Sequence, residues 1–124
     1  MKPMHKISKS LLITLALPLL LAGCANRSDG IKPPALPDAA RYAVFDAAVN
    51  SGVRQSAKWL QQALGVNQDG VIGKQTLAAA QLYDGRELAA KMLGARLQFM
   101  TNIPSWPTFG KGWARRIAAL LSEV

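Results

Sequence analysis

The chain has 124 residues and half of them are apolar, so it is long enough for one small domain and is not a disordered tail. Its single cysteine excludes an internal disulfide framework and any metal site made of several thiolates. The formal charge of +8 predicts an acidic partner: nucleic acid, an anionic membrane surface or an acidic polymer.

The first 23 residues have the order of a secretory signal peptide. Lys2, Lys6 and Lys9 precede an apolar run over residues 11–22 that only Pro18 interrupts. This run has 12 residues, whereas a helix needs roughly 20 to span a bilayer. A buried core helix is the alternative, but the run lacks the polar face that a small soluble domain needs. We therefore predict that residues 1–23 are an export signal.

The end of this run, Leu21-Ala22-Gly23-Cys24, resembles the bacterial lipobox. The resemblance implies cleavage between Gly23 and Cys24, with diacylglycerol attached to the sulfur of Cys24, whose thiolate is the nucleophile. The alternative is a cysteine that stands there by chance. Several acyl chains anchor a protein stably, so we expect a membrane-bound chain. Ala25 stands where an Asp would imply the inner membrane, so the resemblance implies the outer membrane, facing the periplasm.

Loss of the signal changes the chemistry that the chain can support. Without residues 1–23, which hold three lysines and no acid, 101 residues with a charge of +5 remain. The only histidine, His5, is also lost, which excludes Ser-His-Asp and Cys-His catalysis and the usual zinc sites. We predict no metal and no cofactor. The three prolines in residues 24–38 predict a lipidated, extended tether, and residues 39–124 form the predicted domain.

The pattern from Ala39 onward is helical, with no run of alternating strand residues, and predicts an all-α bundle of about five short helices. A turn that ends in Asp69-Gly70 separates the second helix from the third, and a capping box that begins at Asp84 starts the fourth. The prolines of residues 103–107 argue against a helix there. The predicted helices are 39–49, with Tyr42, Phe45 and Val49 on one face, then 53–64, 74–82, 85–101 and 113–122.

Glycoside hydrolysis usually needs two positioned carboxylates. Of the seven acids, only Asp46 lies on a predicted helix without an evident local task. A structural hydrogen bond is the favoured interpretation of Asp46, and a part in catalysis is the alternative.

Four ordered segments resemble the C-terminal, predicted peptidoglycan-binding part of glycoside hydrolase family 108 N-acetylmuramidases. They are Phe45–Gly52, Trp59–Gly65, Asp69–Gly73 with Thr76 and Leu77, and Trp106–Trp113 with Arg115 and Arg116. In that family the catalytic Glu lies in a preceding Glu-Gly-Gly-Tyr-like segment. This chain has no Glu before Glu87, so no catalytic residue carries over.

The resemblance implies peptidoglycan as the ligand, and four residues suit it. Trp106 and Trp113 could stack on sugars, and Arg115 and Arg116 could pair with carboxylates of the stem peptides. The alternative interpretations are packing for the tryptophans and a solvated charge pair for the arginines.

These features favour a noncatalytic, lipid-anchored lipoprotein that joins the outer membrane to peptidoglycan. One alternative is a residual or accessory prophage-type muramidase that uses Asp46. The other is an interaction module that binds a muramidase or another envelope protein through an apolar patch. We expect no nucleic-acid partner, because an exported, lipid-anchored chain does not meet nucleic acid.

Overall fold

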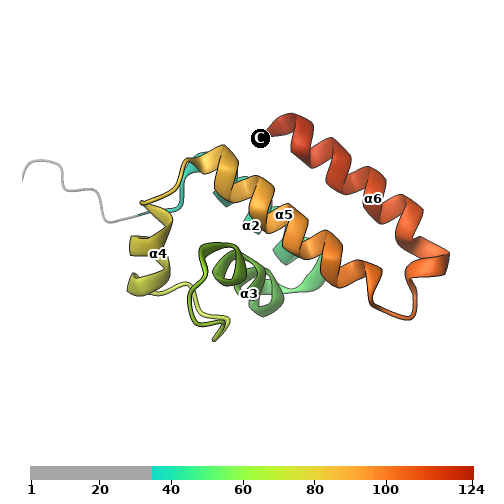
Figure 1. Cartoon of the computed structure of the whole chain (residues 1–124), viewed down its shortest axis with the longest axis horizontal. Coiled ribbons are helices and arrows are strands. Elements are labelled where there is room, and N and C mark those ends of the chain that lie inside the picture. The colour runs from blue at the N-terminus through green and yellow to red at the C-terminus, as the bar shows by residue number, and fades with distance from the viewer. Residues whose placement is uncertain (1–34) are drawn as a thin grey trace, which may run out of the picture. The chain divides into compact units, whose positions relative to one another are not determined.

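The computed structural model describes residues 35–124, which contain five helices and no strand (Figure 1). The predicted all-α class is therefore confirmed for this part of the chain, which forms a compact unit of its own. The signal peptide, the lipobox with Cys24 and most of the predicted tether lie outside the described residues. The helices are α2 (Asp38–Ser51), α3 (Val53–Leu64), α4 (Lys74–Ala80), α5 (Gly85–Thr101) and α6 (Trp106–Glu123).

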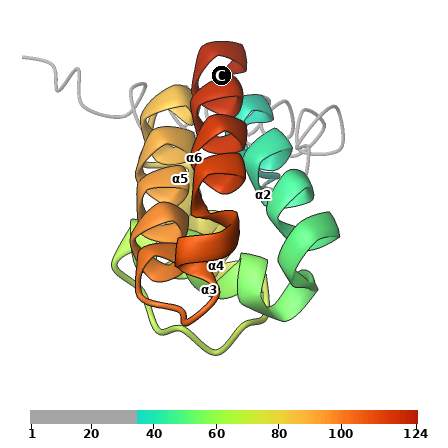
Figure 2. The same ribbon diagram turned by 90° about the vertical axis from the view of Figure 1, so that its right-hand side faces the viewer.

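Helix α5 is the centre of the bundle, because it contacts α2, α3 and α6 (Figures 1 and 2). Its fully buried residues Leu88, Met92 and Leu93 form the middle of the hydrophobic core, and Leu60 of α3 and Ile117 of α6 pack into the same cluster. A helix covered from several sides is apolar over much of its circumference. The residues of α5 that face its neighbours therefore decide how α2, α3 and α6 are held.

The predicted apolar face of α2 exists, but it does not face the core. Phe45 and Val49 are 66% and 69% exposed, and Tyr42 is also exposed. The buried face consists of Asp46 and small residues, namely Ala40, Ala43 and Ala47. Alanines let α2 approach α3 and α5 closely, and this close packing directs the larger side chains outward.

The Asp-Gly turn between α3 and α4 is organised by one buried amide. The Nε2 group of Gln61 donates to Oδ1 of Asp69 at 2.7 Å, to the carbonyl of Val71 at 2.9 Å and to Oγ1 of Thr76 at 3.1 Å. Its Oε1 accepts from the N–H of Gly70 at 2.9 Å, where the φ of 78° suits glycine. These residues recur in the string that carries the family resemblance, and in this structure they hold a loop.

The predicted ends of two helices are close to those observed. Helix α4 ends at Ala80, two residues before the prediction, because residues 81–83 continue as a tighter turn. Asp84 caps α5 as predicted: its Oδ1 accepts from the N–H groups of Arg86 and Glu87 at 2.9 and 3.2 Å. The Glu87 carboxylate pairs with Nζ of Lys91 at 3.0 Å, one turn further along α5.

The predicted start of the last helix is wrong. Helix α6 begins at Trp106 and not at Trp113, so Trp106 and Pro107 are helical although we predicted a break over 103–107. Pro107 lies in the first turn, where its missing N–H removes no intrahelical hydrogen bond. The N–H of Phe109 donates to the carbonyl of Ser105 at 3.1 Å and closes that first turn.

The last residues of the predicted tether contact the helical unit. Nε2 of Gln81 donates to the carbonyl of Ala35 at 2.6 Å, and Leu36 packs against the core. Pro37 lies against Gly85, where an added Cβ would approach the proline Cβ to 2.8 Å.

None of the helices within residues 35–124 combines the length and the apolar character needed to cross a bilayer.

Two glycines of α6 offer a matched test of this packing. A Cβ on Gly110 would overlap the indole of Trp106, at 2.6 Å from Cε2 and 2.8 Å from Cε3, whereas a Cβ on Gly112 would meet nothing within 4 Å. We expect Gly110→Ala to lower the free energy of unfolding by about 2 kcal/mol through overpacking. Gly112→Ala should raise it by up to about 1 kcal/mol through helix propensity. Urea unfolding followed by circular dichroism measures both, and equal effects would contradict the assigned position of Trp106.

Candidate functional site

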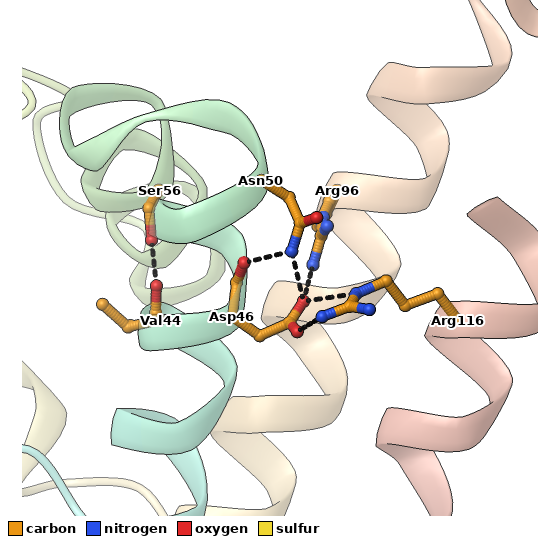
Figure 3. A network of polar contacts seen from close by, with 6 residues as sticks. All are labelled: Val44, Asp46, Asn50, Ser56, Arg96 and Arg116. Carbon is orange, nitrogen blue, oxygen red and sulfur yellow. Dashed lines mark hydrogen bonds and ion pairs between the residues drawn. The ribbon is translucent and has the colours of Figure 1, made fainter.

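A buried carboxylate joins three helices through two arginines (Figure 3). Asp46 of α2 accepts from Nη1 of Arg96 on α5 at 2.7 Å. From α6, Arg116 donates its Nε to Oδ2 of Asp46 at 3.3 Å and its Nη2 to Oδ1. The side chains of Asp46 and Arg96 are only 8% and 4% exposed, whereas that of Arg116 is 51% exposed. Asp46 thus pairs with one buried arginine and one half-exposed arginine.

Further hydrogen bonds fix the position of Asp46. Nδ2 of Asn50 donates to the backbone carbonyl of Asp46 at 2.8 Å and lies 3.5 Å from its Oδ2. Next to this group, Oγ of the buried Ser56 donates to the carbonyl of Val44 at 2.7 Å and ties α3 to α2 (Figure 3). Hydrogen bonds therefore fix both the backbone carbonyl and the carboxylate of Asp46.

The two arginines also determine the protonation of Asp46. Burial by itself would raise the pKa of the Asp46 carboxyl, but the hydrogen bonds and charges of Arg116 and Arg96 outweigh burial and lower that pKa below its ordinary value of 3.8. In turn, the hydrogen bonds that Arg116 donates to Asp46 raise the pKa of Arg116. A general acid of a glycosidase needs a raised pKa. Asp46 has the opposite shift, which agrees with the favoured structural interpretation of this residue.

Beside the ion pair lies a pocket of about 480 Å³, within the range of small-molecule sites. Helices α2, α3, α5 and α6 and the loop between α5 and α6 all contribute to it. The lining residues are Asn50, Ser51, Gln55, Trp59, Arg96, Phe99, Met100, Ile103, Ser105, Trp113 and Arg116.

The apolar walls of the pocket are aromatic. Trp59 and Phe99 meet edge to face, with ring centroids 5.5 Å apart. The guanidinium of Arg96 lies 5.9 Å from the Trp59 ring centroid, within cation–π range. Trp113 also lines the pocket and packs against Trp106 and Phe109, at centroid distances of 6.2 and 5.8 Å. Aromatic faces next to guanidinium groups can bind a ligand that carries both a sugar or apolar face and a negative charge.

The structure separates the four residues that we predicted to bind ligand. Trp113 and Arg116 line the pocket. Trp106 does not line it; it packs against Trp113 and Gly110 and so supports the pocket wall from outside. Arg115 is exposed and is also absent from the lining.

Arg96 and Phe99 line the pocket although neither was predicted from the sequence to bind ligand, and Trp59, also among the lining residues, is buried with 2% exposure. A signal for Arg96 was present: it follows Met92 by four residues and precedes Met100 by four, on the buried stripe of α5. A charged residue on such a stripe needs a partner. No group of three or more His, Cys, Asp and Glu side chains in residues 35–124 is placed to hold a metal ion.

Comparison with known proteins places residues 55–118 within a family described as "Predicted Peptidoglycan domain". The chain is also similar to the solved structure of Brucella abortus SagA, with 38% sequence identity and a TM-score of 0.69. This match covers 71% of the chain and 51% of SagA, so the chain corresponds to about half of that protein. No curated protein matches the chain.

Removal of the buried carboxylate should destabilise the fold. We expect Asp46→Asn to lower the free energy of unfolding by about 3 kcal/mol, because Arg96 would keep a buried charge without a counterion. Because the pKa of Asp46 is lowered in the folded chain, its contribution to stability is complete above about pH 4 and is lost as the pH falls further. Urea unfolding from pH 2 to 7 should therefore give a flatter pH profile for the variant.

Asp38→Asn is the matched control, because Asp38 is on the same helix and pairs with Arg41 in solvent. It should change the free energy of unfolding by less than about 1 kcal/mol. If the two variants lose the same stability, the ion pair does not have the structural role assigned to it.

Proposed function

Since the chain belongs to the predicted peptidoglycan domain family, we propose that it is a noncatalytic lipoprotein that links the outer membrane to the cell wall. Membership in this family implies the cell envelope as its place of action. The single observation that carries the proposal is the aromatic and cationic pocket, nine of whose eleven lining residues lie within the family match over residues 55–118.

The pocket fits a wall polymer better than it fits a small ion. Phe99 and Trp113 offer accessible aromatic surface, and Arg116 offers a half-exposed guanidinium. Sugar rings stack on aromatic faces, and carboxylates pair with arginine in a bidentate geometry. Peptidoglycan carries both kinds of group on one polymer.

The absence of catalysis is part of the proposal and rests on the acids of the domain. Asp46 is ionised and holds two arginines, Asp69 accepts from Gln61 and the Val71 N–H, and Asp84 caps α5. These structural tasks support a binding module related to the C-terminal part of family 108 muramidases.

The lipid anchor is proposed from the sequence alone. Cys24 follows small residues at the end of an apolar run, as in the lipobox, and Ala25 supports the outer membrane. Acylation there would attach the domain through residues 25–37 to the membrane surface, while the pocket binds the wall.

A second candidate function, an envelope interaction module, is favoured by one observation. Tyr42, Phe45 and Val49 expose three large apolar side chains along one face of α2. Such a contiguous apolar face is typical of a protein contact. Co-purification of a muramidase or another envelope protein, lost on Phe45→Ser, would support this function.

Binding to the wall is tested with purified peptidoglycan sacculi. We expect residues 25–124 to sediment with sacculi, and Trp113→Ala to weaken this binding about tenfold through loss of a stacking wall. Leu82→Ala is the control, because Leu82 is exposed and does not line the pocket. A wild-type domain that stays in the supernatant would defeat the proposal.

The anchor is tested separately in whole cells. We expect the wild-type chain to incorporate radiolabelled palmitate and to fractionate with the outer membrane, because Cys24 carries the acyl chains. Cys24→Ser should abolish both properties while binding to sacculi persists. An unlabelled wild-type protein would remove the anchor from the proposal and leave wall binding untouched.

A further inference from the structure

We propose that the pocket recognises a carboxylate of the peptidoglycan stem peptide, bound by Arg116 beside the buried charge of Arg96, and does not select the uncharged glycan alone. This inference rests on the proposed wall-binding function and names the part of the wall that the pocket takes.

The positive charges at the pocket outnumber the negative ones. Two guanidinium groups, on Arg96 and Arg116, share the single carboxylate of Asp46. Among the residues that line the pocket there are these two arginines and no Asp or Glu. Of the acids outside the lining, Glu87 pairs with Lys91 and Asp38 pairs with Arg41. The pocket therefore carries an excess of one positive charge, which a single carboxylate would balance.

Both arginines have N–H donors that do not bond to Asp46. Arg116 contacts Asp46 through Nε and Nη2, so its Nη1 keeps both of its donors. Arg96 contacts Asp46 through Nη1, and its Nε is buried without a hydrogen-bond partner. An unsatisfied buried donor on a charged group is rare and needs an explanation. A ligand carboxylate at Nη1 of the half-exposed Arg116 would accept from donors that Asp46 leaves without a partner, beside the fixed positive charge of Arg96.

The side chains of the two arginines differ in their exposure to solvent. Arg96 is 4% exposed and is held between Asp46 and the Trp59 ring, so it provides a fixed charge. Arg116 is 51% exposed and reaches across from α6, so it can meet a ligand from the open side. A pocket with one fixed and one accessible guanidinium is suited to an anion that arrives from solvent.

The walls exclude a simple anion as the preferred ligand. A phosphate or chloride ion would leave Phe99, Ile103 and Trp113 without contact in a pocket of about 480 Å³. An uncharged chain of N-acetylglucosamine would cover the rings but would leave the extra positive charge unbalanced. A muropeptide has the sugar faces, the short peptide and the carboxylates together, and so it matches both halves of the pocket.

The adjacent arginines of α6 provide a matched pair of variants. Arg116→Gln removes the pocket charge, whereas Arg115→Gln removes the same charge from an exposed residue outside the lining. We titrate each variant with a disaccharide-tetrapeptide muropeptide and follow tryptophan fluorescence. The Kd should be at least tenfold higher for Arg116→Gln than for the wild type, and the Kd of Arg115→Gln should change less than twofold. Thermal unfolding of both variants confirms that they are folded under the conditions of the titration.

The ligand side of the test uses the wild-type chain and does not depend on a variant that folds. The muropeptide should displace the protein from sacculi, whereas chitotetraose and a muropeptide with amidated carboxyl groups should need at least tenfold higher concentrations. If chitotetraose and the amidated muropeptide compete as well as the free acid, the inference is overturned although wall binding stands. If the wild-type protein never binds sacculi, the proposed function itself fails.

Discussion

The burial of one carboxylate constrains much of this domain. Asp46 lies on the alanine-rich face of α2, where an ionised group is tolerated only with a counterion. The counterions are Arg96 of α5 and Arg116 of α6, which follow Asp46 by 50 and 70 residues in the chain. A buried ion pair adds little net stability over an apolar cluster, but the loss of one partner is costly. The ion pair ties α2 to both α5 and α6.

The same ion pair makes the neighbouring pocket cationic. Because Asp46 neutralises only one of the two guanidinium groups, the pocket beside it keeps a positive charge in surroundings made of Trp59, Phe99 and Trp113. Charges in such partly water-free surroundings interact more strongly than charges on an open surface. Stability and the proposed recognition thus depend on one set of side chains, and the half-exposed Arg116 belongs to both.

The string around the Asp-Gly turn, which carries part of the family resemblance, and the pocket occupy different parts of the domain. Gln61, Asp69, Gly70 and Thr76 form the network that holds the loop between α3 and α4. None of them lines the large pocket. The string thus holds a loop, whereas the proposed binding pocket is built from α2, α3, α5, α6 and the loop between α5 and α6. The similarity to SagA covers 71% of the chain and about half of that protein.

The sequence by itself determined the all-α class, helix 53–64, the Asp-Gly turn and the cap at Asp84, because these depend on local periodicity and on backbone hydrogen bonds between near neighbours. Only the tertiary structure decided that the Phe45 face of α2 points to solvent, because that depends on which face packs closest to α5. It also decided that Arg96 meets Asp46. No local pattern specifies a pair 50 residues apart, since the contact exists only after two helices cross at one particular distance and angle.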